Sequence, residues 1–259
     1  MAKAIMIQGT ASGVGKTILT LALCRIFKQD GHAVSPFKAQ NMTLNTCLTN
    51  IGDEIAVSQW LQAKAACTTP SKDMNPIVLK PPYSNHINPA KKLDMIMASY
   101  NRLCKQYNVI VIEGAGSPVE LNLNQNDMVN MGMAKRANAP VILASDIDRG
   151  GIFASLYGTI NIMKDWERDH VKATIVNRFR GEPALFADGV KILEDITELP
   201  VAGIVPYINI NLPEEDGLVS SNINFEAMED FESEFDRIAD IVRKSLDMKL
   251  VYEILNSGV

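Results

Sequence analysis

A glycine-rich segment near the start of the chain carries residues that can hold the phosphates of a nucleotide. It reads GTASGVGKT over residues 9–17 and directly follows the apolar run KAIMIQ. Glycines let backbone N–H groups turn toward phosphate oxygens, the lysine neutralises the outer phosphates, and the threonine hydroxyl can coordinate Mg²⁺. We therefore predict that ATP and Mg²⁺ bind here. The predicted contacts are Gly9, Thr10, Ser12, Gly13, Val14, Gly15, Lys16 and Thr17.

The length of this loop indicates which class of nucleotide-binding protein the chain resembles. In the common Walker A pattern the first glycine lies five positions before the glycine of the Gly-Lys pair, whereas here it lies six positions before it. The longer loop resembles the dethiobiotin-synthetase superfamily, in which ATP activates a carboxyl-type group. ATPases of the partition and septum-placing type carry an extra lysine early in the loop, and residues 10–13 contain none. The loop therefore argues against a dimerising switch ATPase, and a glycine turn without a ligand is the remaining alternative.

Charged side chains follow two further apolar runs. Lys38, in PFKAQNM, is predicted to reach the γ-phosphate or an acceptor carboxylate, with a solvated loop lysine as the alternative. The run VIVI delivers Glu113 to the end of a buried strand, where a carboxylate is costly unless it is paired or metal-bound, so we predict Glu113 as a Mg²⁺ ligand. Glu54, just before a helix that carries Gln59 and Gln62, is predicted either as a second Mg²⁺ ligand or as a residue that stabilises the helix dipole.

Neutral polar side chains near these charges could bind a substrate. Gln40, Asn41 and Asn45 follow Lys38 and offer hydrogen-bonding groups for polar substrate arms, and Ser117 lies in the small-residue segment after Glu113. We predict these four as substrate contacts. Asp127 suits the N-cap of a helix that starts at Met128.

Alternating elements must position these residues. Short apolar runs alternate with amphipathic stretches, which predicts an α/β fold with a mostly parallel sheet and helices on both faces. In such sheets ligands bind beyond the carboxyl ends of the strands, where each motif above falls. The predicted strands are Lys3–Gln8, Ala33–Phe37, Val109–Ile112, Val141–Ala144, Lys172–Asn177 and Val201–Val205. The predicted helices are Gly15–Gln29, Asp53–Ala66, Pro89–Gln106, Met128–Ala137, Gly151–Lys164, Pro183–Thr197 and a terminal helix over Phe225–Leu255.

Composition limits the partners. The 259 residues carry a net charge of −5 without a basic block, so a nucleic acid is not expected. No apolar run approaches the roughly 20 residues of a membrane span, and no membrane association is predicted. The N-terminus lacks the pattern of a signal peptide, and the four cysteines have no paired metal-type spacing, which predicts reduced thiols and a cytoplasmic protein.

Taken together, the motifs resemble the cobyric acid synthase family over about residues 3–218. The matching segments are GTASGVGKT, PFKAQNMTLN, MNPIVLKP, VIEGAGSPVE, DMVNMGMA, SDIDRGGIFASLYGT, VNRFRG and VAGIVPY. The resemblance implies a dethiobiotin-synthetase-like P-loop fold and ATP-dependent amidation of four peripheral carboxylates of adenosylcobyrinic acid a,c-diamide. Each carboxylate becomes an acyl phosphate that ammonia displaces. The resemblance also implies that Asp127 positions or stabilises the phosphorylated intermediate and that Asn177 contacts adenine. With Lys16 and Lys38, Asp127 completes the expected catalytic set.

Two features depart from the family pattern. The segment KPPYSNHINPA over residues 80–90, a predicted loop, is shorter than usual, which puts corrinoid binding by this region in doubt. The family also carries a C-terminal glutaminase domain with a cysteine and a histidine, whereas this chain has histidines only at positions 32, 86 and 170. We expect residues 1–224 to form the synthetase domain and residues 225–259 a helix packed on it. Free ammonia or a separate glutaminase subunit would then supply nitrogen.

Other interpretations stay open from the sequence. A ligase acting on another polycarboxylate, such as dethiobiotin synthetase, shares the loop. An ATP-binding switch or a degenerate homologue would keep the nucleotide site without ligation. A homodimer is suggested only by analogy with the superfamily.

Overall fold

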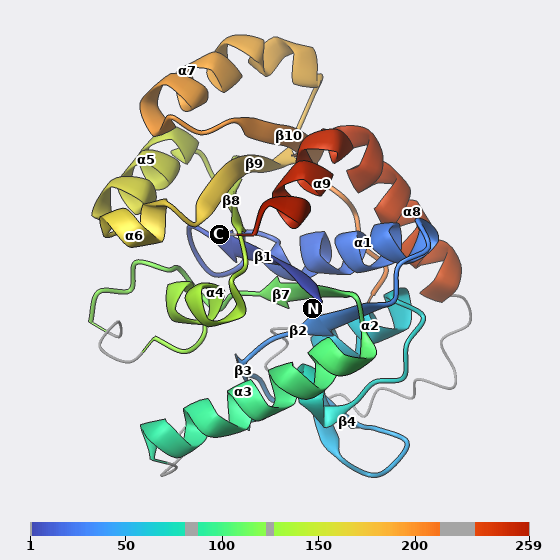
Figure 1. Ribbon diagram of the computed structural model, residues 1–259. Coiled ribbons are helices and arrows are strands. Elements are labelled where there is room, and N and C mark those ends of the chain that lie inside the picture. Colours follow the sequence, from blue (N-terminus) through green and yellow to red (C-terminus); the bar gives the residue numbers. More distant parts are fainter. Residues whose placement is uncertain (1, 81–87, 123–126, 213–230, 259) are drawn as a thin grey trace.

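The computed structural model describes residues 2–80, 88–122, 127–212 and 231–258 (Figure 1). Residues 81–87 of the predicted loop, residues 213–224 of a polar segment and residues 225–230 of the predicted terminal helix lie outside these ranges. Within the described part of the chain, none of the helices combines the length and apolar character that crossing a bilayer requires.

A six-stranded sheet forms the centre of the molecule. Its strand order is β10-β9-β8-β1-β7-β2, and every neighbouring pair is parallel. The strands are β1 (Lys3–Gly9), β2 (Val34–Phe37), β7 (Val109–Glu113), β8 (Val141–Asp146), β9 (Val171–Phe179) and β10 (Val201–Pro206). All six predicted strands are present, and the predicted parallel α/β class is confirmed.

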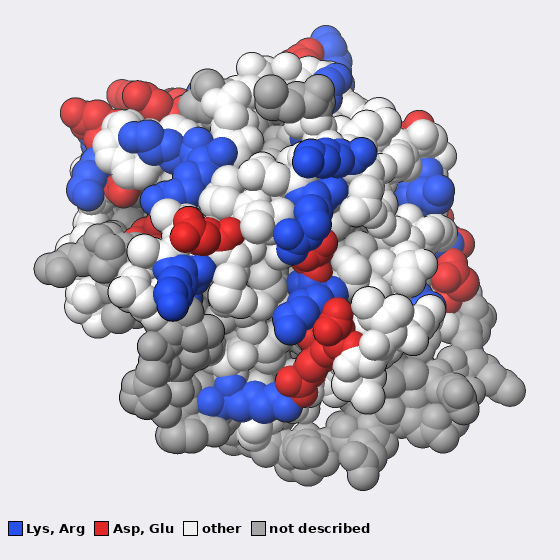
Figure 2. Space-filling model, turned by 60° about the horizontal axis from the view of Figure 1, so that its bottom comes forward, with Lys and Arg blue, Asp and Glu red and all other residues white. Residues whose placement is uncertain are grey.

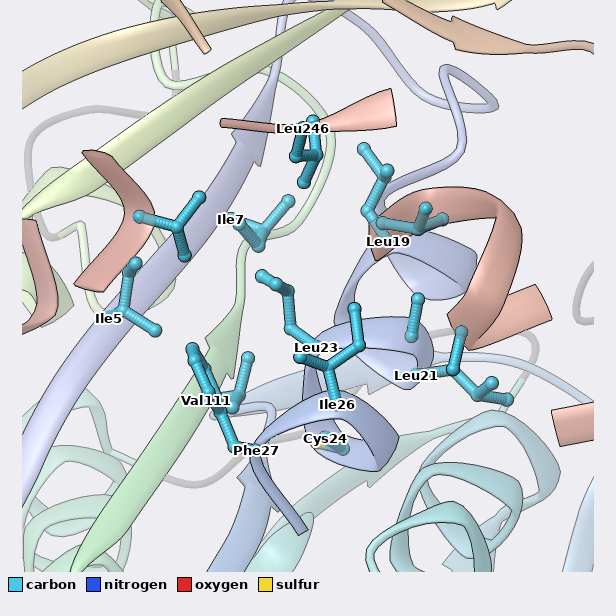
Figure 3. Close-up of a cluster of buried hydrophobic side chains, with 14 of the residues drawn as sticks. Ile5, Ile7, Leu19, Leu21, Leu23, Cys24, Ile26, Phe27, Val111 and Leu246 are labelled. Atoms are coloured by element: carbon cyan, nitrogen blue, oxygen red, sulfur yellow. The ribbon is translucent and has the colours of Figure 1, made fainter. Parts of the chain in front are cut away.

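Alternating side chains of β1 pack on opposite faces of this sheet. Ile5 and Ile7 belong to one buried cluster, and Ala4 and Met6 to the other. On the first face the cluster is completed by α1 (Lys16–Gln29), α2 (Val57–Ala65), α8 (Phe231–Ser245) and α9 (Met248–Ser257). On the second face lie α3 (Pro89–Gln106), α4 (Met131–Ala137), α5 (Ile152–Ile162) and α7 (Ala187–Thr197). In Figure 3, the side chains of Leu23, Ile26 and Phe27 from α1 lie close to Ile5, Ile7 and Val111 from the sheet. Strands buried on both faces explain the continuous apolar runs in the sequence.

Two small sheets were not predicted. Strand β3 (Gln40–Met42) pairs in parallel with β6 (Ile77–Leu79), and β4 (Thr46–Leu48) pairs antiparallel with β5 (Glu54–Ala56). The helix predicted to begin at Asp53 therefore begins only at Val57, because the backbone of the preceding residues is used for strand pairing. The prediction that Glu54 stabilises the dipole at the start of a helix was wrong, because Glu54 lies on β5.

Helices α8 and α9 pack on the first face beside α1 (Figure 1). The Arg25 guanidinium of α1 donates to Asp236 at 2.7 Å and lies 2.8 Å from Glu232, both on α8. The predicted terminal helix is divided in two. Between the two helices Leu246 bridges Gly203 of β10, and the N–H of Asp247 donates to the Ala202 carbonyl at 2.7 Å. Contact with the sheet edge thus ends α8.

Short helices complete the described chain. These are α6 (Asp165–Arg168) and the two 3₁₀ turns η1 (Lys72–Met74) and η3 (Pro183–Phe186). The turn η3 leads directly into α7, so the helix predicted from Pro183 begins as a 3₁₀ turn.

Candidate active site

A cavity of about 900 Å³ opens at the carboxyl ends of the sheet strands. Its volume lies in the upper part of the range typical of small-ligand sites. Most of its lining comes from the loop after β1 with the start of α1, the segment after β2, the turn after β7, the segment around Asp127, and the ends of β9 and β10 with the residues after it. Helices α2 and α3 each add two residues. The topology therefore brings most of the motifs found in the sequence to one place.

The loop after β1 adopts a conformation that requires glycine. Gly13 and Gly15 have φ values of 73° and 96°, in the left-handed region. A Cβ atom on Gly15 would lie 2.2 Å from the Asn177 amide nitrogen, which donates to the Val14 carbonyl at 2.7 Å. Gly15 caps α1 without a side-chain hydrogen bond, and the first turn contains no acidic residue. The N-terminal N–H groups of α1 thus have no side-chain cap, as suits an anion.

The ammonium group of Lys16 lies across this loop. It donates to the carbonyl oxygens of Ala11, at 2.9 Å, and Gly116, at 2.8 Å. Lys16 is largely buried. It lines the cavity together with Ser12, Gly13 and Thr17. A cation held against neutral carbonyl groups is suited to exchange them for phosphate oxygens.

Three of the predicted loop contacts, Gly9, Thr10 and Val14, are not among the residues that line the cavity. Gly9 ends β1, and a Cβ atom there would lie 2.4 Å from the Val14 side chain. The Thr10 hydroxyl shares a hydrogen bond of 2.9 Å with the Ser145 hydroxyl at the end of β8. The hydrogen bond of Thr10 ties the loop to the end of β8.

Glu113 at the end of β7 is the centre of a buried polar cluster. Its side chain is 1% exposed, and its Oε1 accepts from the Thr17 hydroxyl at 2.9 Å and from the Lys38 ammonium at 2.8 Å. The Lys38 side chain is 7% exposed, so the alternative of a solvated loop lysine was wrong. Oε1 of Glu113 therefore joins the end of β7 to Thr17 at the start of α1 and to Lys38 after β2.

The other oxygen of Glu113 faces α2. Its Oε2 accepts from the amide groups of Gln62, at 2.6 Å, and Gln59, at 3.2 Å. Both glutamines are fully buried. From the sequence, both glutamines were predicted to lie on a helix, and no function was assigned to them. The only available signal was their i, i+3 spacing, which places both side chains on one face of that helix. Burial and the nearby charge of Glu113 raise the pKa of the Cys24 thiol, which keeps this α1 cysteine protonated.

Thr17 and Glu113 together fit a Mg²⁺ ion. Mg²⁺ prefers hard oxygen ligands, often one or two carboxylates with phosphate oxygens and water, and these residues present a hydroxyl and a carboxylate to the same cavity. No group of three or more His, Cys, Asp or Glu side chains arranged around a metal position exists among the described residues.

The structure does not bring Glu54 to this site. Its carboxylate pairs with Lys80 and accepts from the Thr46 hydroxyl at 2.7 Å, and Glu54 is not among the residues that line the cavity. Burial tends to raise the pKa of Glu54, but the hydrogen bonds from Lys80 and Thr46 outweigh it and lower the pKa below its ordinary value. The prediction of Glu54 as a Mg²⁺ ligand therefore disagrees with its position in the fold.

Asp127 forms a backbone cap next to the cavity. Its Oδ1 accepts from the N–H groups of Val129 and Asn130, both at 2.9 Å, and its Oδ2 accepts from Gly132 at 2.7 Å. The helix predicted from Met128 begins at Met131 and its N-cap residue is Asn130, so the prediction of Asp127 as the N-cap was wrong. The Asp127 carboxylate nevertheless accepts from the N–H of Gly132 in the first turn of α4. These contacts fix the carboxylate at the cavity wall.

The amide of Asn130 shapes the turn after β7. It accepts from the N–H of Ala115 at 3.0 Å and donates to the carbonyls of Ala115, at 2.6 Å, and Ser117, at 3.1 Å. This residue was not singled out from the sequence. Its contacts hold Gly116 and Ser117 at the cavity surface.

The predicted substrate contacts divide into two groups. Gln40, Asn41 and Ser117 line the cavity, whereas Asn45 is buried outside it. Lys92, near the start of α3, also lines the cavity and was not predicted.

The opposite wall follows β9 and β10. Arg178 has a φ of 60° and its guanidinium lies 3.2 Å from Asp146. Tyr207, which lines the cavity, carries the Arg180 guanidinium 3.7 Å from its ring centroid. Together with Asn177, this wall offers an aromatic ring and an amide, groups suited to a nucleotide base.

Charges of both signs are mixed on the molecular surface. Figure 2 shows basic and acidic side chains next to one another across one face, without a continuous basic area among the residues drawn in colour.

Comparisons with known proteins identify the family of this chain. The family model described as an AAA domain, AAA_26, matches residues 3–214. A cobyric acid synthase of Salmonella gallinarum is 46% identical over 241 aligned residues, which cover 86% of this chain and 48% of that protein. The cobyric acid synthase of Salmonella typhimurium gives the same values. The chain thus spans about half the length of the curated relatives it matches, and it is homologous to that part of them.

A solved structure also shares the fold. The signal recognition particle receptor FtsY of Elizabethkingia anophelis is 21% identical, with a TM-score of 0.51 over 81% of this chain and 60% of that one. At this identity the likeness shows the P-loop NTPase fold alone.

Proposed function

This chain belongs to the AAA domain family AAA_26, and from that premise we propose that it is the ATP-dependent synthetase part of a cobyric acid synthase. It would amidate peripheral carboxylates of adenosylcobyrinic acid a,c-diamide. The proposal rests on the similarity to cobyric acid synthases and on one feature of the site. That feature is the meeting of Lys16, Lys38, Thr17 and Glu113 at a single cavity.

The reaction needs two displacements. An oxygen of the substrate carboxylate attacks the γ-phosphorus of ATP, and ADP leaves, which gives an acyl phosphate. Ammonia then attacks the acyl carbon, inorganic phosphate leaves, and a proton is released as the amide forms. Both steps gain from fixed positive charge near the transferred phosphoryl group.

The residues of this chain provide that charge. Lys16 contacts a carbonyl of the loop that would hold the phosphates, and the Lys38 ammonium lies 2.8 Å from the same Glu113 oxygen that accepts from Thr17. When bound by Thr17 and Glu113, Mg²⁺ would neutralise charge on the phosphate oxygens. Asn177, at the junction of loop and β9, is proposed to contact adenine, and Asp127 to fix the wall near the phosphorylated intermediate.

The substrate side lies beyond Lys38. Gln40, Asn41 and Ser117 present amide and hydroxyl groups there, which suit the polar arms of a corrinoid. We propose free ammonia or a separate glutaminase subunit as the nitrogen source. Residues 1–224 would then form the synthetase domain and residues 225–259 a helical addition to it, in a cytoplasmic protein.

Mass spectrometry tests this proposal directly. The protein is incubated with ATP, Mg²⁺, ammonium and adenosylcobyrinic acid a,c-diamide, and the corrinoid is analysed over time. Each amidation replaces a hydroxyl by an amino group and lowers the mass accordingly, with one ADP formed per amide. Glutamine in place of ammonium, with and without an added glutaminase, tests the nitrogen source.

A matched control separates binding from chemistry. Lys38→Met is expected to bind nucleotide but to form neither ADP nor amide at the wild-type rate. Tight nucleotide binding by the wild type, without any change in the corrinoid, would contradict ligation and favour a switch or a degenerate homologue. ATP-dependent closure of a cyclic urea from a diamine and CO₂, the dethiobiotin synthetase reaction, would instead favour a different ligase.

A further inference from the structure

The side chain of Gln62 connects the two residues proposed to hold Mg²⁺. Its amide nitrogen donates to Glu113 Oε2 at 2.6 Å and to the backbone carbonyl of Thr17 at 3.2 Å. The Thr17 hydroxyl in turn donates to Glu113 Oε1 at 2.9 Å. The three residues therefore form a closed set of contacts between α1, α2 and β7.

The orientation of this amide is determined by its partners. A carboxylate and a carbonyl oxygen only accept hydrogen bonds, so the NH₂ group of Gln62 must face them. The amide oxygen of Gln62 is buried and has no hydrogen-bond partner among the described residues. A buried unpartnered oxygen is unfavourable, and it is tolerated here in the arrangement that directs both N–H groups at Thr17 and Glu113.

Gln59 supports the same carboxylate oxygen. Its own amide oxygen accepts from Asn41, at 2.9 Å, and from the Ser58 hydroxyl, at 3.0 Å, so its nitrogen is turned toward Glu113 Oε2 at 3.2 Å. Two neutral donors thus hold Oε2. Oε1 is left for the Thr17 hydroxyl and the Lys38 ammonium.

We propose that Gln62, assisted by Gln59, is a positioning residue of the Mg²⁺–nucleotide site. It fixes the Glu113 carboxylate with Oε1 toward the cavity and ties it to Thr17. Neither glutamine lines the cavity, so both act through Glu113 and touch no substrate. The inference rests on the proposed function only in that the site must bind a nucleotide with Mg²⁺.

Because such outer contacts orient metal ligands, their loss weakens metal affinity by about 10–100-fold. We therefore expect Gln62→Met, which keeps the length and removes both donors, to raise the Mg²⁺ concentration for half-maximal nucleotide binding about 10-fold or more. Nucleotide binding in EDTA should change little, because the loop contacts are intact. Gln59→Met should shift the Mg²⁺ dependence less, since its hydrogen bond is longer.

The measurement is equilibrium binding of a fluorescent ATP analogue, titrated with Mg²⁺ and repeated in EDTA. Thr174→Val is the matched control, because it also replaces a buried polar side chain whose oxygen has no partner among the described residues. This control should leave both binding curves unchanged. Should Gln62→Met not fold, Gln62→Asn tests the same contacts, since its amide is too short to reach both acceptors.

The possible results are distinct. A raised Mg²⁺ requirement with unchanged binding in EDTA supports the inference. The same Mg²⁺ dependence in folded Gln62→Met as in the wild type overturns it. An equal loss of binding with and without Mg²⁺ also overturns it, because Gln62 would then support the loop as a whole. Absence of nucleotide binding by the wild type would contradict the proposed function itself.

Discussion

The pair Lys38–Glu113 allows a quantitative test of the polar cluster. Glu113→Gln keeps the shape of the side chain but removes its charge, which leaves the Lys38 ammonium, 7% exposed, without its carboxylate. Breaking a buried ion pair by removal of one partner costs about 3–5 kcal/mol. For a domain of this size, 1 kcal/mol corresponds to about 2–4 °C in Tm, so the variant is expected to lose at least about 6 °C. The free energy of unfolding is measured in urea and the Tm by calorimetry.

An exposed pair in the same protein is the matched control. The side chains of Glu54 and Lys80 are 42% and 46% exposed, so Glu54→Gln should cost less than about 1 kcal/mol. The double variant Lys38→Met with Glu113→Gln removes the ammonium along with its carboxylate and should recover most of the loss. If Glu113→Gln and Glu54→Gln cost the same, burial does not govern the strength of the pair, and the description of the cluster is refuted.

Three further predictions concern the loop, the terminal helices and the cap. Gly15→Ala places a Cβ atom 2.2 Å from the Asn177 amide at a positive φ, so it should cost about 1–3 kcal/mol and weaken nucleotide binding, measured by fluorescence titration. Hydrogen bonds from Arg243 lower the pKa of Asp30, so their stabilisation is present above the unfolded-state pKa of about 3.9 and is lost as the pH falls through the folded-state value. Asp30→Asn should therefore lower the free energy of unfolding by about 1 kcal/mol at pH 7, and urea titrations should converge with the wild type in acid. In Asp127→Asn the side chain loses one of its three hydrogen bonds from backbone N–H groups, which should lower the free energy of unfolding by about 1 kcal/mol. The variant should keep its nucleotide affinity while amidation slows. Turnover equal to that of the wild type would remove this residue from the mechanism.

The parallel sheet could be predicted from the sequence because each of its strands can be recognised from a short segment of consecutive residues. Each strand is an apolar run long enough to be recognised, and the glycine loop reports its own conformation through Gly13 and Gly15. The strands β3 to β6 contain only three residues each, too few to show a periodicity. Glu54 was misplaced for that reason, since the pairing of β5 with β4 overrides a local signal for a helix start.

The polar cluster was predictable only in part. The position of Glu113 after an apolar strand indicates that its carboxylate needs a partner. The sequence does not say which donor reaches it. Lys38 lies 75 positions away and Gln62 lies 51 positions away, and only the fold joins them. Asn130 lies within the recognised segment DMVNMGMA, but nothing in that segment indicates that its amide holds the backbone of a turn 13–15 positions away.

On the proposed function, the charge balance at Glu113 bears on how Lys38 would act in phosphoryl transfer. Lys38 and Thr17 share Oε1, so the positive charge of Lys38 is directed at Glu113 in the structure. The same ammonium cannot neutralise Glu113 and a transferred phosphoryl group at full strength, because the Coulomb energy of each pair depends on a short distance. Gln59 and Gln62 make an exchange feasible, since they continue to hold Oε2 when Oε1 loses a donor. A carboxylate anchored by neutral amides on one oxygen can therefore release Lys38 toward the cavity without becoming an unsolvated charge.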